Sequence, residues 1–162
     1  MTTTLSDTER IAIQRKVVAE HLAGENEHDY AKVNATFVQA PRAYYEIAAG
    51  GAHFDGIEGV KGFYELLDSV LPDLDVICTH SYDVPGCSIR EVTARGTHSA
   101  EFAGVPASGN YVSFEVCALY IFDEEEPDKL IAERAYWDND GLIRQLKGEQ
   151  VPSLGLVENP RR

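Results

Sequence analysis

The spacing of the apolar residues changes once along this chain, near Leu74, and that change constrains the fold more than any other feature. Before Leu74 apolar residues recur every three or four positions, as in helices, and after it they alternate with polar residues, as in strands. Helices followed by a run of strands are typical of an α+β domain. We expect the sheet to curl around the helices and to leave a pocket inside.

Three helices are predicted in the first half. Ser6 and Glu9 form a capping-box pattern, and the helical spacing continues as far as Gly24, so the first helix should cover residues 7–23. A shorter helix is expected over residues 30–37. A third helix is stopped by Pro72 and has one apolar face, which is formed by Val60, Phe63, Leu67 and Val70.

The strands are predicted to be long and antiparallel. A short strand over residues 42–47 precedes them, and His53 and Asp55 fall in a loop after it. Short turns rich in Gly, Pro and acidic residues separate the later strands. The alternation places His98 on the inner face of the second one. The four long strands are expected at Leu74–Val84, Ser88–Phe102, Tyr111–Phe122 and Leu130–Trp137.

Composition narrows the class of protein. With 162 residues, 44% of them apolar, the chain fits one globular domain. The formal net charge of -13 would repel phosphate backbones and anionic lipids, so we expect no nucleic acid and no membrane as partners. The three cysteines lack the spacing of a metal site. Because the start of the chain has no secretion signal, we expect a cytoplasmic protein.

Asp138 is the first candidate for chemistry. It follows the last predicted strand and precedes a short apolar helical turn, where Tyr136, Trp137 and Leu142 should shield it from water. Burial raises the pKa of a carboxyl group, which makes it suited to acid–base catalysis near neutral pH. An Asp at this place can also cap the following helix, and the two roles are compatible.

Two histidines are further candidates for catalysis. His98 could orient a substrate or carry a proton, and its alternative role is that of a core histidine bonded to a neighbouring strand. His53 precedes the third helix, where the mouth of a pocket would form, and its alternative is an exposed loop residue. His53 and Asp55 lack a third ligand, so no metal site is expected.

Several short motifs together resemble the SnoaL-like polyketide cyclase family of the nuclear transport factor 2-like superfamily. The resemblance covers residues 8–147. It is carried by Gly96, His98, Gly104 and Pro106, by the ending Asp138, Gly141-Leu142 and Gln145-Leu146, and by the segments 56–61 and 71–74.

This resemblance implies a cone-shaped curved sheet wrapped around three N-terminal helices, an internal pocket, and a homodimer formed through the outer sheet face. It implies one domain over residues 1–147, followed by an arm or tail over residues 148–162. It further implies an enzyme that needs no cofactor and closes a ring by intramolecular aldol reaction in a small carbonyl or polyketide-like compound, or a related lyase or isomerase. In such an enzyme Asp138 would shuttle the proton.

The neighbours of Asp138 are predicted to contact the substrate. Tyr136 shares its face of the last strand and could donate to an enolate oxygen, and Trp137 would shield the site. Some family members have a histidine where this chain has Cys117, and Glu115 could take over its role if it points inward.

Two other functions remain open. Arg134 and Asp138 alternate onto one face, and an arginine beside a carboxylate could activate water for epoxide opening, as in an epoxide hydrolase, if Arg134 faces inward. The protein could instead be a dimer that binds a small apolar or aromatic metabolite without catalysis. The superfold hosts enzymes and binding proteins alike.

Overall fold

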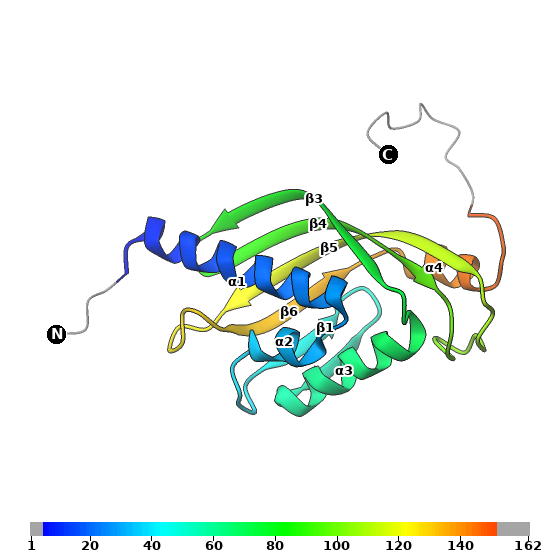
Figure 1. Ribbon diagram of the computed structural model, residues 1–162, viewed down its shortest axis with the longest axis horizontal. Coiled ribbons are helices and arrows are strands. Elements are labelled where there is room, and N and C mark those ends of the chain that lie inside the picture. Colours follow the sequence, from blue (N-terminus) through cyan, green and yellow to red (C-terminus); the bar gives the residue numbers. More distant parts are fainter. Residues whose placement is uncertain (1–4, 152–162) are drawn as a thin grey trace.

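A computed structural model describes residues 5–151, which form one six-stranded sheet with three helices on one side (Figure 1). The strand order is β2-β1-β6-β5-β4-β3, and every pair is antiparallel except β1 and β6. The helices are α1 (Asp7–Glu27), α2 (Tyr30–Ala35), α3 (Gly56–Val70) and α4 (Asn139–Leu146). The strands are β1 (Tyr44–Ile47), β2 (Ala52–Asp55), β3 (Asp75–Val84), β4 (Cys87–Thr97), β5 (Tyr111–Phe122) and β6 (Leu130–Tyr136).

The predicted α+β architecture is confirmed, and the long strands curve around α1 and α3 as Figure 1 shows. The capping box of α1 is present, since Ser6 accepts a hydrogen bond from the Glu9 N–H and the Glu9 carboxylate accepts one from the Ser6 N–H. Two buried clusters of side chains fill the space between helices and sheet, one under α1 to α3 and the other toward α4.

Gly24 does not end the first helix, contrary to the prediction. A Cβ atom at this position would lie 2.8 Å from Cγ2 of Val33 on α2. The glycine therefore allows α1 and α2 to pack closely, and α1 continues to Glu27 and ends where His28 adopts a left-handed conformation with φ 56°. The extra turn matters because it carries Glu25 over the sheet.

Two other boundaries differ from the prediction. Residues 52–55 form strand β2 rather than a loop, because they pair with β1 in antiparallel register. Strand β4 ends at Thr97 rather than Phe102, since beyond it the N–H of Ser99 turns to the carbonyl of Val70 at the end of α3.

One end of β3 is fixed by a buried ion pair. Asp83 Oδ1 lies 2.9 Å from a guanidinium nitrogen of Arg90, and Oδ2 lies 2.8 Å from Nε of Arg15 on α1. Burial works against the Asp83 charge, but hydrogen bonds from Arg15, Ser88 and Arg90 hold the pKa of this carboxyl below its usual value.

Among the described residues, no helix combines the length and apolar character needed to cross a membrane. The predicted arm or tail over residues 148–162 falls mostly outside the described residues, which end at Val151.

Candidate active site

A cavity of about 90 Å³ lies between the sheet and the helices. Its wall is apolar, apart from four polar side chains. The apolar part includes Phe63, Leu67, Val92, Phe114, Trp137 and Leu142, and the polar side chains are Glu25, Tyr45, Tyr120 and Glu133. An apolar cavity with a few polar groups gathered together is the usual form of a small-molecule site.

Two of these polar side chains, Glu25 and Glu133, meet around His21 and Tyr64. His21 and Glu25 are one turn apart on α1, so both face the sheet. Glu133 comes from β6 and Tyr64 from α3. All four are buried, with exposed fractions of 6% for Glu25, 4% for Glu133 and 0% for the other two.

Hydrogen bonds fix the protonation of His21. The Thr36 hydroxyl donates to the carbonyl of Val33 at 2.7 Å, so it must accept from His21 Nδ1, at 2.9 Å. The Tyr64 hydroxyl donates to Oε2 of Glu133 at 2.7 Å, so it must accept from His21 Nε2, also at 2.9 Å. Both ring nitrogens therefore carry hydrogen, and His21 is an imidazolium cation.

The carboxylates stabilise this cation. Nε2 of His21 lies 3.2 Å from Oε2 of Glu133 and 3.7 Å from Oε1 of Glu25. Burial opposes the charge, but the interactions with the two carboxylates outweigh it and raise the pKa of His21 to about 9. For Glu25, burial is the larger effect and raises the pKa of the carboxyl group, although His21 acts in the opposite direction. Burial thus shifts the equilibrium of Glu25 toward its protonated form.

Three buried tyrosines lie near Glu25 and Glu133. Burial, together with the charges of Glu133 and Glu25, raises the pKa of Tyr45, Tyr64 and Tyr120 well above the ordinary value. Their hydroxyl groups therefore stay protonated and can donate hydrogen bonds. Tyr45 and Tyr120 line the cavity, where such a donor could reach a ligand oxygen.

The cluster is better described as a protonated histidine between carboxylates than as a metal site. One ligand atom from each of His21, Glu25 and Glu133 lies within 4.8 Å of the others, a spacing that a metal ion could bridge. However, a metal ligand must offer a lone pair, and both ring nitrogens of His21 donate hydrogen bonds instead.

Asp138 lies outside this cavity, and the expectation that it is shielded is wrong. Its side chain is exposed and accepts a hydrogen bond from the Gly141 N–H at 3.0 Å, so it caps α4. It borders an open groove on the other face of the sheet. The reason is the parity of β6: Glu133 and Trp137 face the cavity, while Asp138, an odd number of residues from each, faces away.

Four other predicted site residues also lie on that outer face. Arg134 forms an ion pair with Glu46, with Nε 2.5 Å from Oε2. Tyr136 is exposed and borders the outer groove with Glu115 and Cys117. Glu115 accepts a hydrogen bond from the Thr93 hydroxyl at 3.1 Å, and partial burial raises the pKa of the Cys117 thiol. Of the predicted substrate contacts, the structure places only Trp137 at the cavity.

The two predicted histidines lie apart from the cavity lining. His98 is fully buried but follows the end of β4 rather than lying within a strand, and its Nδ1 contacts the Ser108 hydroxyl at 2.9 Å. His53 is exposed on β2, stacks on Tyr44 and lies 3.0 Å from Asp55. His98 is thus a core residue and His53 a surface residue.

The sequence contained a signal for the residues that were missed. His21 and Glu25 interrupt the apolar face of a helix one turn apart, and Glu133 interrupts a run of strand residues that are otherwise apolar on that face. Charged residues on faces that should be buried require partners, so such interruptions mark a site.

The sequence matches the SnoaL-like polyketide cyclase family over residues 15–146, which is most of the chain. The chain belongs to this family. A comparison with curated proteins finds no match. The resemblance seen in the sequence is thus confirmed for this SnoaL-like protein.

Solved structures show the same fold at low sequence identity. AclR from Streptomyces galilaeus has a TM-score of 0.72 and 19% identity, with 89% of this chain and 87% of AclR covered. A SnoaL-like protein from Jannaschia sp. CCS1 has a TM-score of 0.71 and 16% identity, with 93% of this chain and 99% of that protein covered. An LEH-like epoxide hydrolase from M. tuberculosis has a TM-score of 0.64 and 17% identity, with 88% of this chain and 92% of that protein covered. These neighbours establish the curved α+β fold of this SnoaL-like protein.

Proposed function

We propose that this SnoaL-like protein is an acid–base enzyme that acts on a small apolar carbonyl compound without a cofactor. The observation that carries the proposal is the pair of buried carboxyl groups, Glu25 and Glu133, on the wall of an apolar cavity with a histidinium between them. Two carboxyl groups held in different protonation states can act as acid and base in the same reaction. We therefore assign to this pair the proton-transfer role that the sequence predicted for Asp138.

Each group has a distinct part in the reaction. Glu133 accepts a hydrogen bond from the Tyr64 hydroxyl and contacts the His21 cation, and it would remove a proton from the carbon next to the substrate carbonyl. Protonated Glu25 would donate its proton to the carbonyl oxygen, which gives the enol. Tyr45 and Tyr120 could stabilise charge that develops on this oxygen.

Ring closure returns both protons. The enol carbon attacks a second carbonyl group of the same molecule, and a carbon–carbon bond forms. The enol O–H proton returns to Glu25, and the proton held by Glu133 passes to the new alkoxide. The cavity holds the reacting ends together, which supplies part of the rate enhancement by proximity.

The test is exchange of α-protons with solvent. Cyclohexanone and 2-tetralone, ketones of one and two rings, are incubated with the protein in D₂O, and deuterium incorporation is followed by NMR. We expect the wild-type protein to accelerate exchange and Glu133→Gln to reduce that acceleration by about 10²-fold or more. Glu115→Gln, a change of an exposed carboxylate on the outer face, is the matched control and should leave exchange unchanged.

Failure would take one of two forms. If the wild-type protein accelerates exchange of neither ketone, or if Glu133→Gln keeps full activity, the acid–base proposal is wrong. A protein that binds the ketones without exchanging their protons would be the non-catalytic binder considered from the sequence.

Epoxide opening is a second candidate on the same residues. The version based on Arg134 and Asp138 requires Arg134 to face inward, and Arg134 instead pairs with Glu46 on the opposite face. Glu133 could activate a water molecule while Glu25 protonates the epoxide oxygen, and an LEH-like epoxide hydrolase shares the fold. Hydrolysis of styrene oxide, measured on the same variants, would distinguish this reaction from proton exchange.

We also propose that the protein is a homodimer formed through the outer sheet face. That face exposes several large apolar side chains of the long strands, which are Ile77, Tyr82, Val84 and Tyr111. Light scattering should give twice the chain mass, and Ile77→Arg should shift it toward the monomer. A monomeric wild-type protein would contradict this proposal.

A further inference from the structure

The charges around the cavity balance only if one of its two carboxyl groups is protonated. Two carboxyl groups, Glu25 and Glu133, line it, and the neighbouring cation is His21. No Lys or Arg is among the described lining residues. If both carboxyl groups ionise, this apolar space holds one uncompensated negative charge, which is costly without a partner.

Glu25 is the carboxyl group with the longer contact to His21. Its nearest cationic atom is Nε2 of His21, at 3.7 Å, which is beyond hydrogen-bond distance. That N–H already donates to the Tyr64 hydroxyl, and the other N–H of the ring donates to the Thr36 hydroxyl. Glu133, by contrast, accepts a hydrogen bond of 2.7 Å from Tyr64. The Glu25 side chain is buried, with an exposed fraction of 6%, and it lines the cavity, where a ligand could reach its carboxyl group.

We propose that the cavity binds a small apolar amine in its protonated form, with the ammonium group against Glu25. This inference uses the cavity of the proposed function but does not depend on catalysis. The ammonium group would offset the charge of the Glu25 carboxylate and donate hydrogen bonds to its oxygens.

The aromatic wall supports the choice of a cation. Six aromatic residues line the cavity, and the negative faces of such rings attract ammonium groups. An anion of the same shape would meet these faces and two carboxyl groups, with no Lys or Arg in the lining to offset them. The six are Tyr45, Phe63, Phe102, Phe114, Tyr120 and Trp137.

Binding should release a proton. Burial raises the pKa of Glu25, so a proton on its carboxyl group would leave for solvent when the ammonium group enters, and the carboxylate would pair with the ligand. The exchange balances, with one cation entering and one proton departing. A neutral ligand of the same shape has no reason to displace the proton, so proton release separates the two modes of binding.

The test compares three ligands that share a ring and differ in charge: benzylamine, benzyl alcohol and benzoate. Trp137 is the one tryptophan of the chain and lines the cavity, so its fluorescence reports occupancy. At pH 7 we expect benzylamine to bind about 10-fold or more tightly than benzyl alcohol, and benzoate to bind least. Calorimetry in two buffers of different ionisation enthalpy should show release of about one proton for benzylamine and none for the alcohol.

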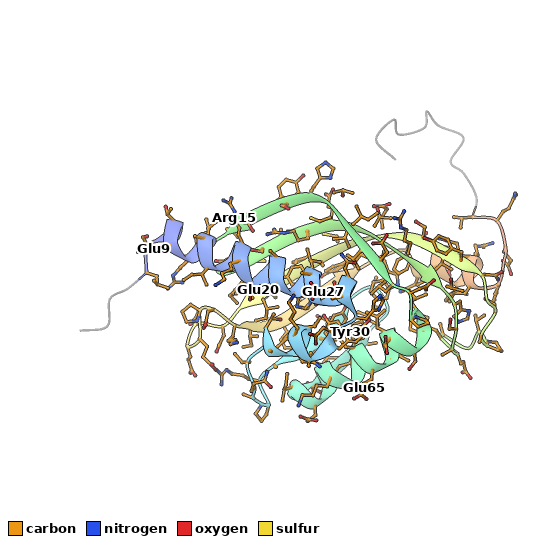
Figure 2. The ribbon with its side chains drawn as sticks, in the orientation of Figure 1. Glu9, Arg15, Glu20, Glu27, Tyr30 and Glu65 are labelled. Carbon is orange, nitrogen blue, oxygen red and sulfur yellow. The ribbon has the colours of Figure 1, made fainter. Side chains whose placement is uncertain are left out.

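Glu25→Gln identifies the contact. It should reduce benzylamine affinity to that of benzyl alcohol while leaving the affinity for the alcohol unchanged. Glu20→Gln is the matched control, because Glu20 lies on the same helix and is exposed, where Figure 2 labels it. If Glu25→Gln does not fold, the proton-release measurement on the wild-type protein still decides the matter.

The inference is overturned if benzoate or benzyl alcohol binds as tightly as benzylamine, or if benzylamine binds without releasing a proton. These outcomes are independent of the exchange experiment above. Proton exchange without amine selectivity would leave the proposed enzyme intact, and amine selectivity without exchange would leave a binding protein for cationic ligands.

Discussion

Nε2 of His21 lies 3.2 Å from Oε2 of Glu133, and the hydroxyl of Tyr64 is hydrogen-bonded to both. The three side chains come from α1, β6 and α3, so this contact joins the sheet to two of the helices that cover it. A buried cation and anion in contact are expensive to separate, because either one alone would be left in an apolar interior. Folding and protonation are therefore coupled here.

Stability should fall as the pH rises from 6.5 to 9. The pKa of His21 is raised from 6.5 to about 9 in the folded protein, so the stabilisation is complete below pH 6.5 and is lost as the pH passes through 9. The raised pKa corresponds to about 3 kcal/mol of unfolding free energy. Urea unfolding at a series of pH values measures how the free energy of unfolding changes with pH. His21→Gln should be less stable at pH 6.5 and should lose this slope, and a wild-type protein of constant stability over the range would contradict the assignment of His21 as a cation.

Tyr64→Phe should destabilise the protein by about 1–3 kcal/mol, because it removes the hydroxyl that links His21 to Glu133 and leaves buried polar groups with fewer partners. Chemical denaturation gives the difference. Tyr82→Phe, which removes the same atom from an exposed tyrosine, should change stability by less than about 0.5 kcal/mol. Equal effects of the two changes would show that the Tyr64 hydroxyl has no special role.

Asp138→Ala should cost about 1 kcal/mol, since it removes the cap from α4, whereas Asp138→Asn should cost much less because asparagine also caps well. Both variants should retain ketone exchange and benzylamine binding. The combination of denaturation and activity measurements separates the structural role from the catalytic one. If Asp138→Asn folds normally but loses exchange, the role predicted from the sequence is restored.

Asp83→Ala should destabilise the fold by about 3–5 kcal/mol, because it leaves the buried guanidinium of Arg90 without its carboxylate. The Asp75–Arg95 ion pair on the same two strands is about half exposed and serves as the control. Asp75→Ala should cost no more than about 1 kcal/mol. Thermal unfolding of the two variants side by side measures the contrast, and similar losses would mean that burial of the Arg90 pair is unimportant.

Much of the fold followed from local patterns. The capping box at Ser6, the apolar faces of the helices and the period-two strands after Leu74 were sufficient to predict an α+β domain with a curved sheet. The motifs from Gly96 to Pro106 and from Asp138 to Leu146 were sufficient to place the chain in its family. Gly24 was misjudged because its role depends on Val33, a contact between helices that no local pattern contains.

The sequence by itself determined the elements, the family and the presence of charged residues in apolar surroundings, since these depend on short-range periodicity and composition. Only the tertiary structure decided which carboxyl groups face the cavity. A shift of one residue in β6 exchanges its two faces, so Asp138 caps a helix in solvent while Glu133 joins His21 and Glu25 in the interior. That choice depends on pairing with β1 and β5 and on the packing of α1, which brings residues more than a hundred positions apart into contact.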